Sequence, residues 1–304
     1  MELKKITENC YYFSSATNIG LLKKGNDVLL IDAGLEKGTA KAVLRLLNEN
    51  DWTLTHILIT HAHADHFGGA QHLQEKTGAK IFSTPFEKAI LENPLYEPFY
   101  LFGGAYPIKE LCNKFLQAPT IMVDQEIELG QQTIDCFELE IIPLPGHTLG
   151  QFGIKYEGVL YLADALFAEE ILKKHGIPYF VDLDLAQRSF DLLEQIEDCL
   201  FFLPSHGQAF SSIKDLVRSN RQYLYEILNI VREALPGDSQ DIFQKTLAKL
   251  KIKIDNPAQY HLLRAAFLAY LSYLSNNGEA LCLVEDNKLK WKKNAHPDKH
   301  PVER

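Results

Sequence analysis

Three histidines and one aspartate occupy four of the six positions in the stretch HAHADH, residues 61–66. Only 11 of the 304 residues are histidine, so this density is far above what chance would give. Alternate side chains of an extended chain point to the same side, which lets His61 and His63 bind one ion together. Asp65 and His66 follow at a turn, from which they can reach a second ion. The cluster therefore indicates a metal site.

Three more metal donors each stand at the end of an apolar run: His147 in IIPLPGHTLG, Asp164 in VLYLADALF and His206 in FFLPSHGQ. Taken one at a time, such residues are usually caps or turn residues. Together with the cluster they make five histidines and two aspartates, and two metal ions need about six to eight protein donors. Imidazole with carboxylate favours Zn²⁺, with Fe, Mn or Co as alternatives. No cysteine stands beside these positions to supply a thiolate.

The order of these motifs along the chain resembles that of the metallo-β-lactamase superfamily of metal-dependent hydrolases. The resemblance covers roughly residues 8–210 and rests on His61-x-His63-x-Asp65-His66, then Gly146-His147-Thr148, then Asp164, then Ser205-His206-Gly207. Members that resemble hydroxyacylglutathione hydrolase (glyoxalase II) share this pattern. The implied fold is α/β, of the α+β kind. It is a four-layer αβ/βα sandwich in which two mixed sheets pack between outer helices, with the metals at one edge.

The resemblance also implies a role for each donor. Metal 1 would be bound by His61, His63 and His147, metal 2 by Asp65, His66 and His206, and both ions by Asp164. Asp32, in LLIDAG, would support the cluster from outside the set of ligands. An equally good interpretation of Asp32 is that it caps the turn before Gly34.

A site of this composition points to hydrolysis. A shared carboxylate and a shared water hold two ions about 3.5–4 Å apart, and the ions lower the pKa of that water so that hydroxide forms at neutral pH. The hydroxide would attack the carbonyl of an ester, thioester or lactone of a small molecule, with Asp65 as the catalytic residue that orients it. A redox-active site with a single iron is a competing hypothesis. A degenerate binding module is disfavoured because no ligand is missing.

Residues 84–118 are rich in aromatic residues, proline and glycine, and they interrupt the strand pattern. The composition predicts short helices and loops. A segment of this length between strands usually has a task, such as forming one wall of a pocket near the metal site. The candidate pocket residues are Tyr100, Phe102, Tyr106 and, further along the chain, Tyr179. Packing into the aromatic core is the alternative for each of them.

Several local patterns predict the elements that must position these residues. Gly25-Asn26 between two apolar runs predicts a β-hairpin, and LTHILIT, just before the histidine cluster, predicts a buried strand. Helices are predicted over GTAKAVLRLLNEN, GGAQHLQEKTG and LAQRSFDLLEQIEDC. Strands return in a β-rich half that begins with IMVD at residue 121 and ends near Asp164.

The pattern changes near residue 210, which predicts a catalytic domain at 1–210 and a second domain at 211–304. In the second domain, helices are expected at about 211–235, 239–252 and 257–276, followed by the strands ALCLVED and KLKWKK. This order resembles the small winged-helix domain that ends some superfamily members.

Two roles are open for this C-terminal domain. The favoured role is packing beside the active site or dimerisation, so a homodimer remains an option. The alternative is that the protein is a metal-dependent phosphodiesterase or ribonuclease. The domain would then hold nucleic acid through its basic patch, which consists of Lys288, Lys290, Lys292 and Lys293.

Charge is unevenly distributed over the chain, whose formal net charge is −9. Residues 1–210 hold 16 Lys and Arg against 29 Asp and Glu, or −13, whereas residues 211–304 hold 15 against 11, or +4. A catalytic part this acidic repels polyanions. We therefore expect a small-molecule substrate and disfavour nucleic acid.

The distribution of apolar residues and cysteines also predicts the cellular compartment of the protein. No apolar run reaches the roughly 18–20 residues that span a bilayer, and the first residues lack the apolar core of a secretory signal. The five cysteines have no paired spacing, which fits a reducing environment better than a disulfide framework. The sequence thus predicts a cytoplasmic protein without a membrane partner.

Overall fold

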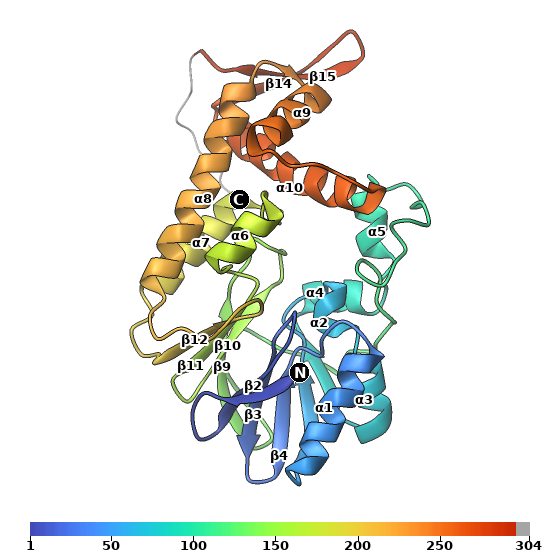
Figure 1. Ribbon diagram of the computed structural model, residues 1–304, viewed down its shortest axis with the longest axis vertical. Helices are drawn as coiled ribbons and strands as arrows, with labels where there is room; N and C mark the ends of the chain where they lie inside the picture. Colours follow the sequence, from blue (N-terminus) through green and yellow to red (C-terminus); the bar gives the residue numbers. More distant parts are fainter. Residues whose placement is uncertain (296–304) are drawn as a thin grey trace.

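Two β-sheets packed face to face form the centre of the molecule (Figure 1). The computed structural model describes residues 1–295. The larger sheet has seven strands in the order β1 (Glu2–Lys5), β2 (Cys10–Ser14), β3 (Ile19–Lys24), β4 (Asp27–Ile31), β5 (Thr53–Leu58), β6 (Lys80–Ser83) and β7 (Gln125–Glu126). The smaller sheet has five strands in the order β12 (Phe201–Pro204), β11 (Val159–Ala163), β10 (Phe152–Tyr156), β9 (Phe137–Pro143) and β8 (Gly130–Ile134).

Helices cover the outer face of each sheet. The larger sheet is covered by α1 (Lys37–Glu49) and α3 (Ala70–Thr77), and the smaller one by α6 (Glu169–His175), α7 (Leu183–Glu194) and α8 (Lys214–Ala234). One apolar core lies between the two sheets, and another lies under the helices on each side. The layers therefore run helix, sheet, sheet, helix, which confirms the predicted four-layer sandwich.

Strand β4 shows how the sequence produces this layering. Val28 and Leu30 face the core under α1 and α3, whereas Leu29 and Ile31 face the core between the sheets. Because successive side chains of a strand point to opposite faces, a strand buried on both faces must be apolar at every position. The predicted hairpin is also present: β3 and β4 are antiparallel and joined at residues 25–26, where Gly25 has a φ of 64°.

Parallel pairing collects the chemically interesting residues at the ends of strands. Strands β4, β5 and β6 are parallel to one another, so their carboxyl ends lie at the same edge of the larger sheet. Asp32 directly follows β4, and the histidine cluster follows β5. In the smaller sheet β11 and β12 are parallel, and they are followed by Asp164 and, after Ser205, by His206.

The segment at 84–118 contains two short helices, α4 (Pro85–Leu91) and α5 (Tyr96–Leu101), and is otherwise irregular, as its composition predicts. The strand predicted from IMVD is absent, and only Gln125–Glu126 pairs with β6. Asp124 accounts for this difference. Its amide donates to the carbonyl of Ile81 at 2.9 Å, and its carboxylate accepts from the amide of Ile81 at 2.8 Å, so a side chain takes the place of a ladder bond.

The C-terminal part continues after α8 with β13 (Gly237–Asp238), α9 (Ser239–Leu250), α10 (Pro257–Asn276), β14 (Ala280–Glu285) and β15 (Lys288–Lys293). The three helices and two longer strands lie within a few residues of the predicted ranges. The strands form a small sheet in the order β13, β15, β14. The helices share one continuous apolar core with α6, α7 and the smaller sheet, so side chains pack across the predicted boundary at residue 210. The domain division and the winged-helix likeness stay predictions.

Within residues 1–295, no helix combines the length and the apolar character needed to cross a membrane.

Gly68, at the end of the short helix α2 (Ala64–Phe67), offers a test of how tightly the cluster is packed. A Cβ there would lie 1.9 Å from the carbonyl oxygen of Leu35, which belongs to the backbone and has little room to move. We expect Gly68→Ala to lower the free energy of unfolding by about 3 kcal/mol. Urea unfolding followed by circular dichroism measures this.

Gly38→Ala is the matched control for that experiment, because a Cβ at Gly38 in α1 would meet nothing closer than 3.9 Å. Alanine also favours a helix more than glycine does, by about 0.5–1 kcal/mol. We expect this variant to be as stable as the natural protein or slightly more stable. Equal losses in both variants would contradict the close approach at Gly68.

Candidate metal centre

The donors predicted from the sequence converge between the two sheets. Their ligand atoms form three groups, in each of which all atoms lie within 4.8 Å of one another. The groups are His61, His63 and His147; His61, His66 and Asp164; and Asp65, His66 and His206. The first and third groups coincide with the two sets that the resemblance implied.

Asp164 lies between these two sets. One carboxylate oxygen is 3.3 Å from Nε2 of His206 and 3.6 Å from Nε2 of His147, and the other is 3.7 Å from Nε2 of His66. The residue is 4% exposed. Its position, directly after β11, therefore allows one buried carboxylate to reach imidazoles from three different loops.

Hydrogen bonds made outside the cluster set the orientation of the imidazoles. Nδ1 of His66 donates to Asp32 at 2.8 Å, Nδ1 of His147 donates to the carbonyl of Tyr179 at 2.7 Å, and Nδ1 of His206 donates to the carbonyl of Ala16 at 2.7 Å. When each ring is neutral, its proton then resides on Nδ1, which leaves the lone pair of Nε2 directed to the centre. Metal-binding histidines characteristically have such outer partners.

Asp32 holds two parts of this arrangement. Besides His66, its carboxylate accepts hydrogen bonds from the amide of Thr60 at 2.8 Å and from the hydroxyl of Thr60 at 3.0 Å. The end of β5 and the imidazole of His66 are thus tied to one carboxylate. Asp32 itself has a φ of 66°, in the left-handed region, so the chain turns sharply at this residue.

The structure supplies a direct test of whether these residues fit a metal. Nε2 of His61, Nε2 of His66 and one oxygen of Asp164 are buried without a hydrogen-bond partner among residues 1–295. Nε2 of His147 faces Nδ1 of His63 at 2.8 Å. Unpartnered buried polar atoms are costly. Neutral imidazole and carboxylate are also the donors that Zn²⁺ and related divalent ions prefer. The donor set therefore fits a metal site.

The electrostatics of the metal-free protein divide the histidines into two kinds. Burial lowers the pKa of His61 well below its ordinary value, and burial likewise lowers the pKa of His147. Burial also opposes the charge on His66, but the carboxylates of Asp65 and Asp32 outweigh it and raise the pKa of His66 well above its ordinary value.

The same balance between burial and neighbouring charges sets the pKa values of His206 and Asp164. Burial again disfavours the charged ring, yet Asp164 and Asp65 raise the pKa of His206 to about 9. For Asp164, burial disfavours the carboxylate, but His206 and His66 hold its pKa well below the ordinary value. In the absence of metal, protons on His66 and His206 thus compensate the buried carboxylates.

Two polar residues of the site are missing from the sequence-based prediction. The hydroxyl of Thr17 donates to Asp65 at 2.8 Å. Glu87 is fully buried and accepts hydrogen bonds from the amide of Ala62, the hydroxyl of Thr148 and the amide of Gly150, at 2.8, 2.6 and 3.0 Å. Glu87 thus ties the loop of the cluster to the loop of His147. Its place in an irregular aromatic segment gave no local sign of this role.

Of the four candidate pocket residues, two lie at the site. The ring of Tyr179 is 5.4 Å from that of His63 and 5.6 Å from that of His147. Tyr100 is 41% exposed, and burial of its phenol together with the proximity of Tyr179 raises the pKa of that phenol. Both are therefore suitable to form one wall of a substrate pocket.

The structure does not bring the other two to the metal donors. Phe102 packs 5.3 Å from the ring of His261 in α10, in an apolar cluster with Leu262. Tyr106 is 77% exposed and makes no ring contact with any aromatic residue of the described chain. Their positions follow from tertiary packing against α10 and from loop exposure, neither of which is visible in the segment itself.

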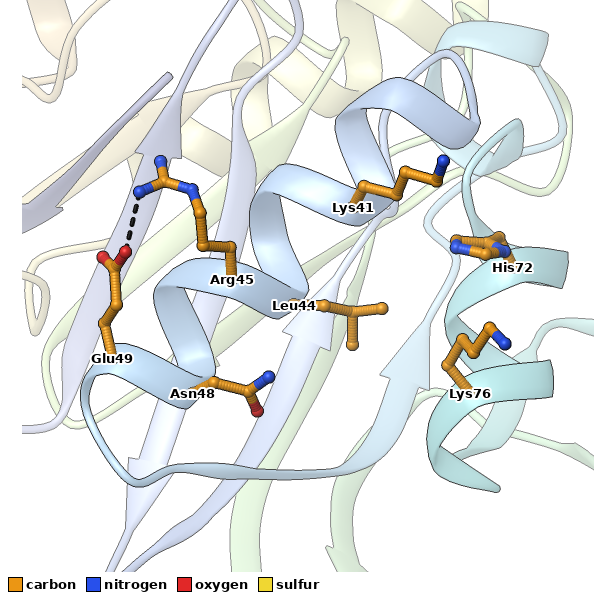
Figure 2. Close-up of a pocket in the computed structure, with 7 residues that line it drawn as sticks. All are labelled: Lys41, Leu44, Arg45, Asn48, Glu49, His72 and Lys76. Atoms are coloured by element: carbon orange, nitrogen blue, oxygen red, sulfur yellow. Dashed lines mark hydrogen bonds and ion pairs between the residues drawn. The ribbon is translucent and has the colours of Figure 1, made fainter.

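A separate surface depression of about 530 Å³ lies between α1 and α3 (Figure 2). Its lining residues are Lys41, Leu44, Arg45, Asn48, Glu49, His72 and Lys76, none of which is buried. Arg45 pairs with Glu49 at 2.7 Å across one end of it. None of the predicted metal donors contributes to this depression, so the chemistry lies elsewhere.

Comparison with known proteins was made for both sequence and structure. The family model of the metallo-beta-lactamase superfamily matches residues 14–206. An uncharacterized protein of Mycobacterium tuberculosis is 24% identical over 209 residues, which are 66% of this chain and 86% of that protein. The hydroxyacylglutathione hydrolase GloC of Haemophilus influenzae is 34% identical over 140 residues, which are 45% of this chain and 60% of that protein.

Solved structures resemble almost the whole chain. A beta-lactamase domain protein from Burkholderia ambifaria has a TM-score of 0.72 at 18% identity, covering 96% of this chain and 93% of that one. A metallo-beta-lactamase family protein from Thermus thermophilus has a TM-score of 0.69 at 20% identity, covering 91% and 93%. The fold, the donor set and the family match agree, and the chain belongs to the metallo-beta-lactamase superfamily of hydrolases.

Proposed function

We propose that this protein uses two divalent metal ions, preferentially Zn²⁺, to hydrolyse the carbonyl of an ester, thioester or lactone in a small molecule. The observation that carries the proposal is the convergence of the donors into two sets with the carboxylate of Asp164 between them. Iron and manganese remain alternatives, because imidazole and carboxylate also bind them.

One ion would be held by His61, His63 and His147, the other by Asp65, His66 and His206, with Asp164 shared between them. Two divalent ions bound there would lower the pKa of a coordinated water molecule and polarise the carbonyl of the substrate.

We propose that Asp65 is the residue that accepts a hydrogen bond from the attacking water and orients it. Burial disfavours its carboxylate, but His66 and His206 hold the pKa of Asp65 below its ordinary value, so it is ionised at neutral pH. The hydrogen bond from Thr17 fixes one oxygen. The carboxylate can therefore accept a hydrogen bond from the water and keep it directed at the substrate.

Support for a carbonyl substrate comes from two sides. Relatives named hydroxyacylglutathione hydrolase are 34% and 31% identical to part of this chain. The aromatic ring of Tyr179 beside the donors suits an acyl group. The match to those relatives covers 45% of this chain, so the identity of the thiol or alcohol that leaves is not part of the proposal.

The nucleic-acid alternative has less support. A recognition helix must present one face to the groove of DNA, but α10 contacts α5, α7, α8 and β14 here (Figure 1). Two of the four lysines of the basic patch form ion pairs, Lys288 with Asp238 at 3.4 Å and Lys292 with Glu285 at 2.6 Å. We therefore favour a packing role for this part of the chain.

Removing a metal donor should abolish both metal loading and turnover. We expect His63→Ala and Asp164→Ala to lose at least one bound ion and to lower kcat by more than about 100-fold, since even the loss of outer partners costs about 10- to 100-fold. Elemental analysis and hydrolysis of a panel of thioesters and lactones measure the two effects. His72→Ala, in the surface depression of Figure 2, is the control. Full activity in metal-free protein would contradict the proposal.

Asp32→Asn should weaken metal binding without removing a ligand. The amide keeps the shape of the carboxylate but loses the charge that stabilises His66 and one of the acceptors for Thr60. We expect about a 10- to 100-fold loss of metal affinity, measured by competition with a chelating dye. Asp27→Asn, at the exposed start of the same strand, should leave the affinity unchanged. Unchanged affinity in both variants would count against the role of Asp32.

Metal binding should release protons at neutral pH. In the metal-free protein the pKa of His66 is raised and that of His206 is about 9, so both rings are protonated at pH values below these. Ions compete with these protons, and the apparent metal affinity should rise with pH until His206 is deprotonated near 9. Calorimetry at neutral pH in buffers of different ionisation enthalpy measures the release. Binding heats that do not depend on the buffer would rule it out.

A further inference from the structure

The turn formed by residues 15–18, between β2 and β3 of the larger sheet, supplies none of the metal donors. It nevertheless contacts the loop of His206, which follows β12 in the smaller sheet. The carbonyl of Ala16 accepts from Nδ1 of His206 at 2.7 Å, and the amide of Asn18 donates to the carbonyl of Ser205 at 2.7 Å. The turn therefore joins the two sheets beside the metal centre.

The side chain of Asn18 adds two more bonds to the same loop. Asn18 is 3% exposed, and its Nδ2 donates to the carbonyl of Pro204 at 3.0 Å and to the carbonyl of Gly207 at 2.8 Å. Both partners can only accept, so the amide nitrogen must face them. The two carbonyls flank His206 along the chain. One side chain thus holds both ends of the loop that presents this imidazole.

Asn18 keeps this orientation although its oxygen has no partner. Oδ1 of Asn18 is buried and accepts no hydrogen bond from any residue in 1–295, which costs stability. Asn220 is also buried, but its Oδ1 accepts from the amide of Phe167 at 3.0 Å, and its Nδ2 donates to two carbonyls at 2.8 Å each. The loop of His206, and not complete hydrogen bonding of the amide, therefore accounts for the orientation of Asn18.

The neighbouring residue in the turn holds a second metal donor. Thr17 is 5% exposed, and its hydroxyl donates to Oδ2 of Asp65 at 2.8 Å. The same oxygen is 3.7 Å from Nε2 of His206 and 3.8 Å from Nε2 of His66. A carboxylate oxygen has two lone pairs, so it can accept from Thr17 and still face the two imidazoles. Consecutive residues of one turn therefore hold two of the three donors in one set.

We propose that Thr17 and Asn18 are positioning residues that set the affinity for the ion bound by Asp65, His66 and His206. This inference rests on the proposed function, because it requires two ions in separate donor sets. Thr17 acts through Asp65, and Asn18 acts through His206. Loss of either contact allows its donor to move away from the other two, and the ion of this set then binds more weakly.

The other donor set is held by different groups. The carbonyl of Tyr179 orients His147, and Glu87 ties the loop of His147 to the loop of the histidine cluster through Thr148 and Ala62. None of these contacts involves residues 15–18. The ion bound by His61, His63 and His147 should therefore remain when the turn is altered.

The test is a titration of the metal-free protein with Co²⁺, whose visible absorption reports each ion as it binds. Asn18→Leu keeps the approximate volume but removes both donors, and Thr17→Val removes only the hydroxyl. We expect each variant to bind one ion as tightly as the natural protein does and the other about 10- to 100-fold more weakly. Thr17→Ser keeps the hydroxyl and should retain both affinities.

A reference variant and a control identify the ion and the cause. His206→Ala lacks a donor of the affected set, so with one ion bound it should have the same absorption spectrum as Asn18→Leu. Thr246 is fully buried in α9, where its hydroxyl donates to the carbonyl of Ile242 at 2.8 Å. Thr246→Val should lower the melting temperature and leave both metal affinities unchanged.

The outcomes separate this inference from the proposed function. If the natural protein binds two ions but cleaves no ester, thioester or lactone, the proposed function fails, and the titration still decides the role of the turn. If Thr17→Val and Asn18→Leu keep both affinities, or lose both equally, the positioning role is overturned. Thr17→Val decides the matter where Asn18→Leu does not fold. Selective loss of one ion, retained in Thr17→Ser, supports the role.

Discussion

The carboxylate of Asp164 is the group on which the rest of the site depends. It is buried, and it lies within 3.3–3.7 Å of imidazoles from three separate loops. Without a positive partner, a carboxylate at this depth would cost several kcal/mol. Either protons on His66 and His206 or metal ions must compensate it. The two sets of donors are therefore coupled through the charge of Asp164. The carboxylate lies between both sets because the two sheets meet at the ends of these strands.

Around this charge, several donors are held by groups outside the donor set. Asp32 holds His66, the carbonyl of Tyr179 holds His147, and Glu87 joins the loops of the cluster and of His147. Such contacts fix the tautomer and direction of each ring before a ligand arrives.

Most local features could be predicted from the sequence, since they depend on neighbouring residues. The hairpin at Gly25-Asn26, the apolar run of β4, and the helices α1, α3, α8, α9 and α10, which lie close to their predicted ranges, all follow from turn chemistry and hydrophobic periodicity. The predicted strand at IMVD failed because the side chain of Asp124 takes a backbone position in the ladder. Such a substitution depends on a partner, Ile81, that is distant along the chain.

The sequence by itself determined which residues are the candidate metal donors and which apolar runs they follow, because residue type and spacing are enough to recognise donors and strand ends. Only the tertiary structure decided what surrounds them. The contacts of Glu87 and the packing of Phe102 against α10 join segments separated by 25 to about 160 residues. No periodicity spans such distances, since these contacts form only when the two sheets and the C-terminal helices pack together.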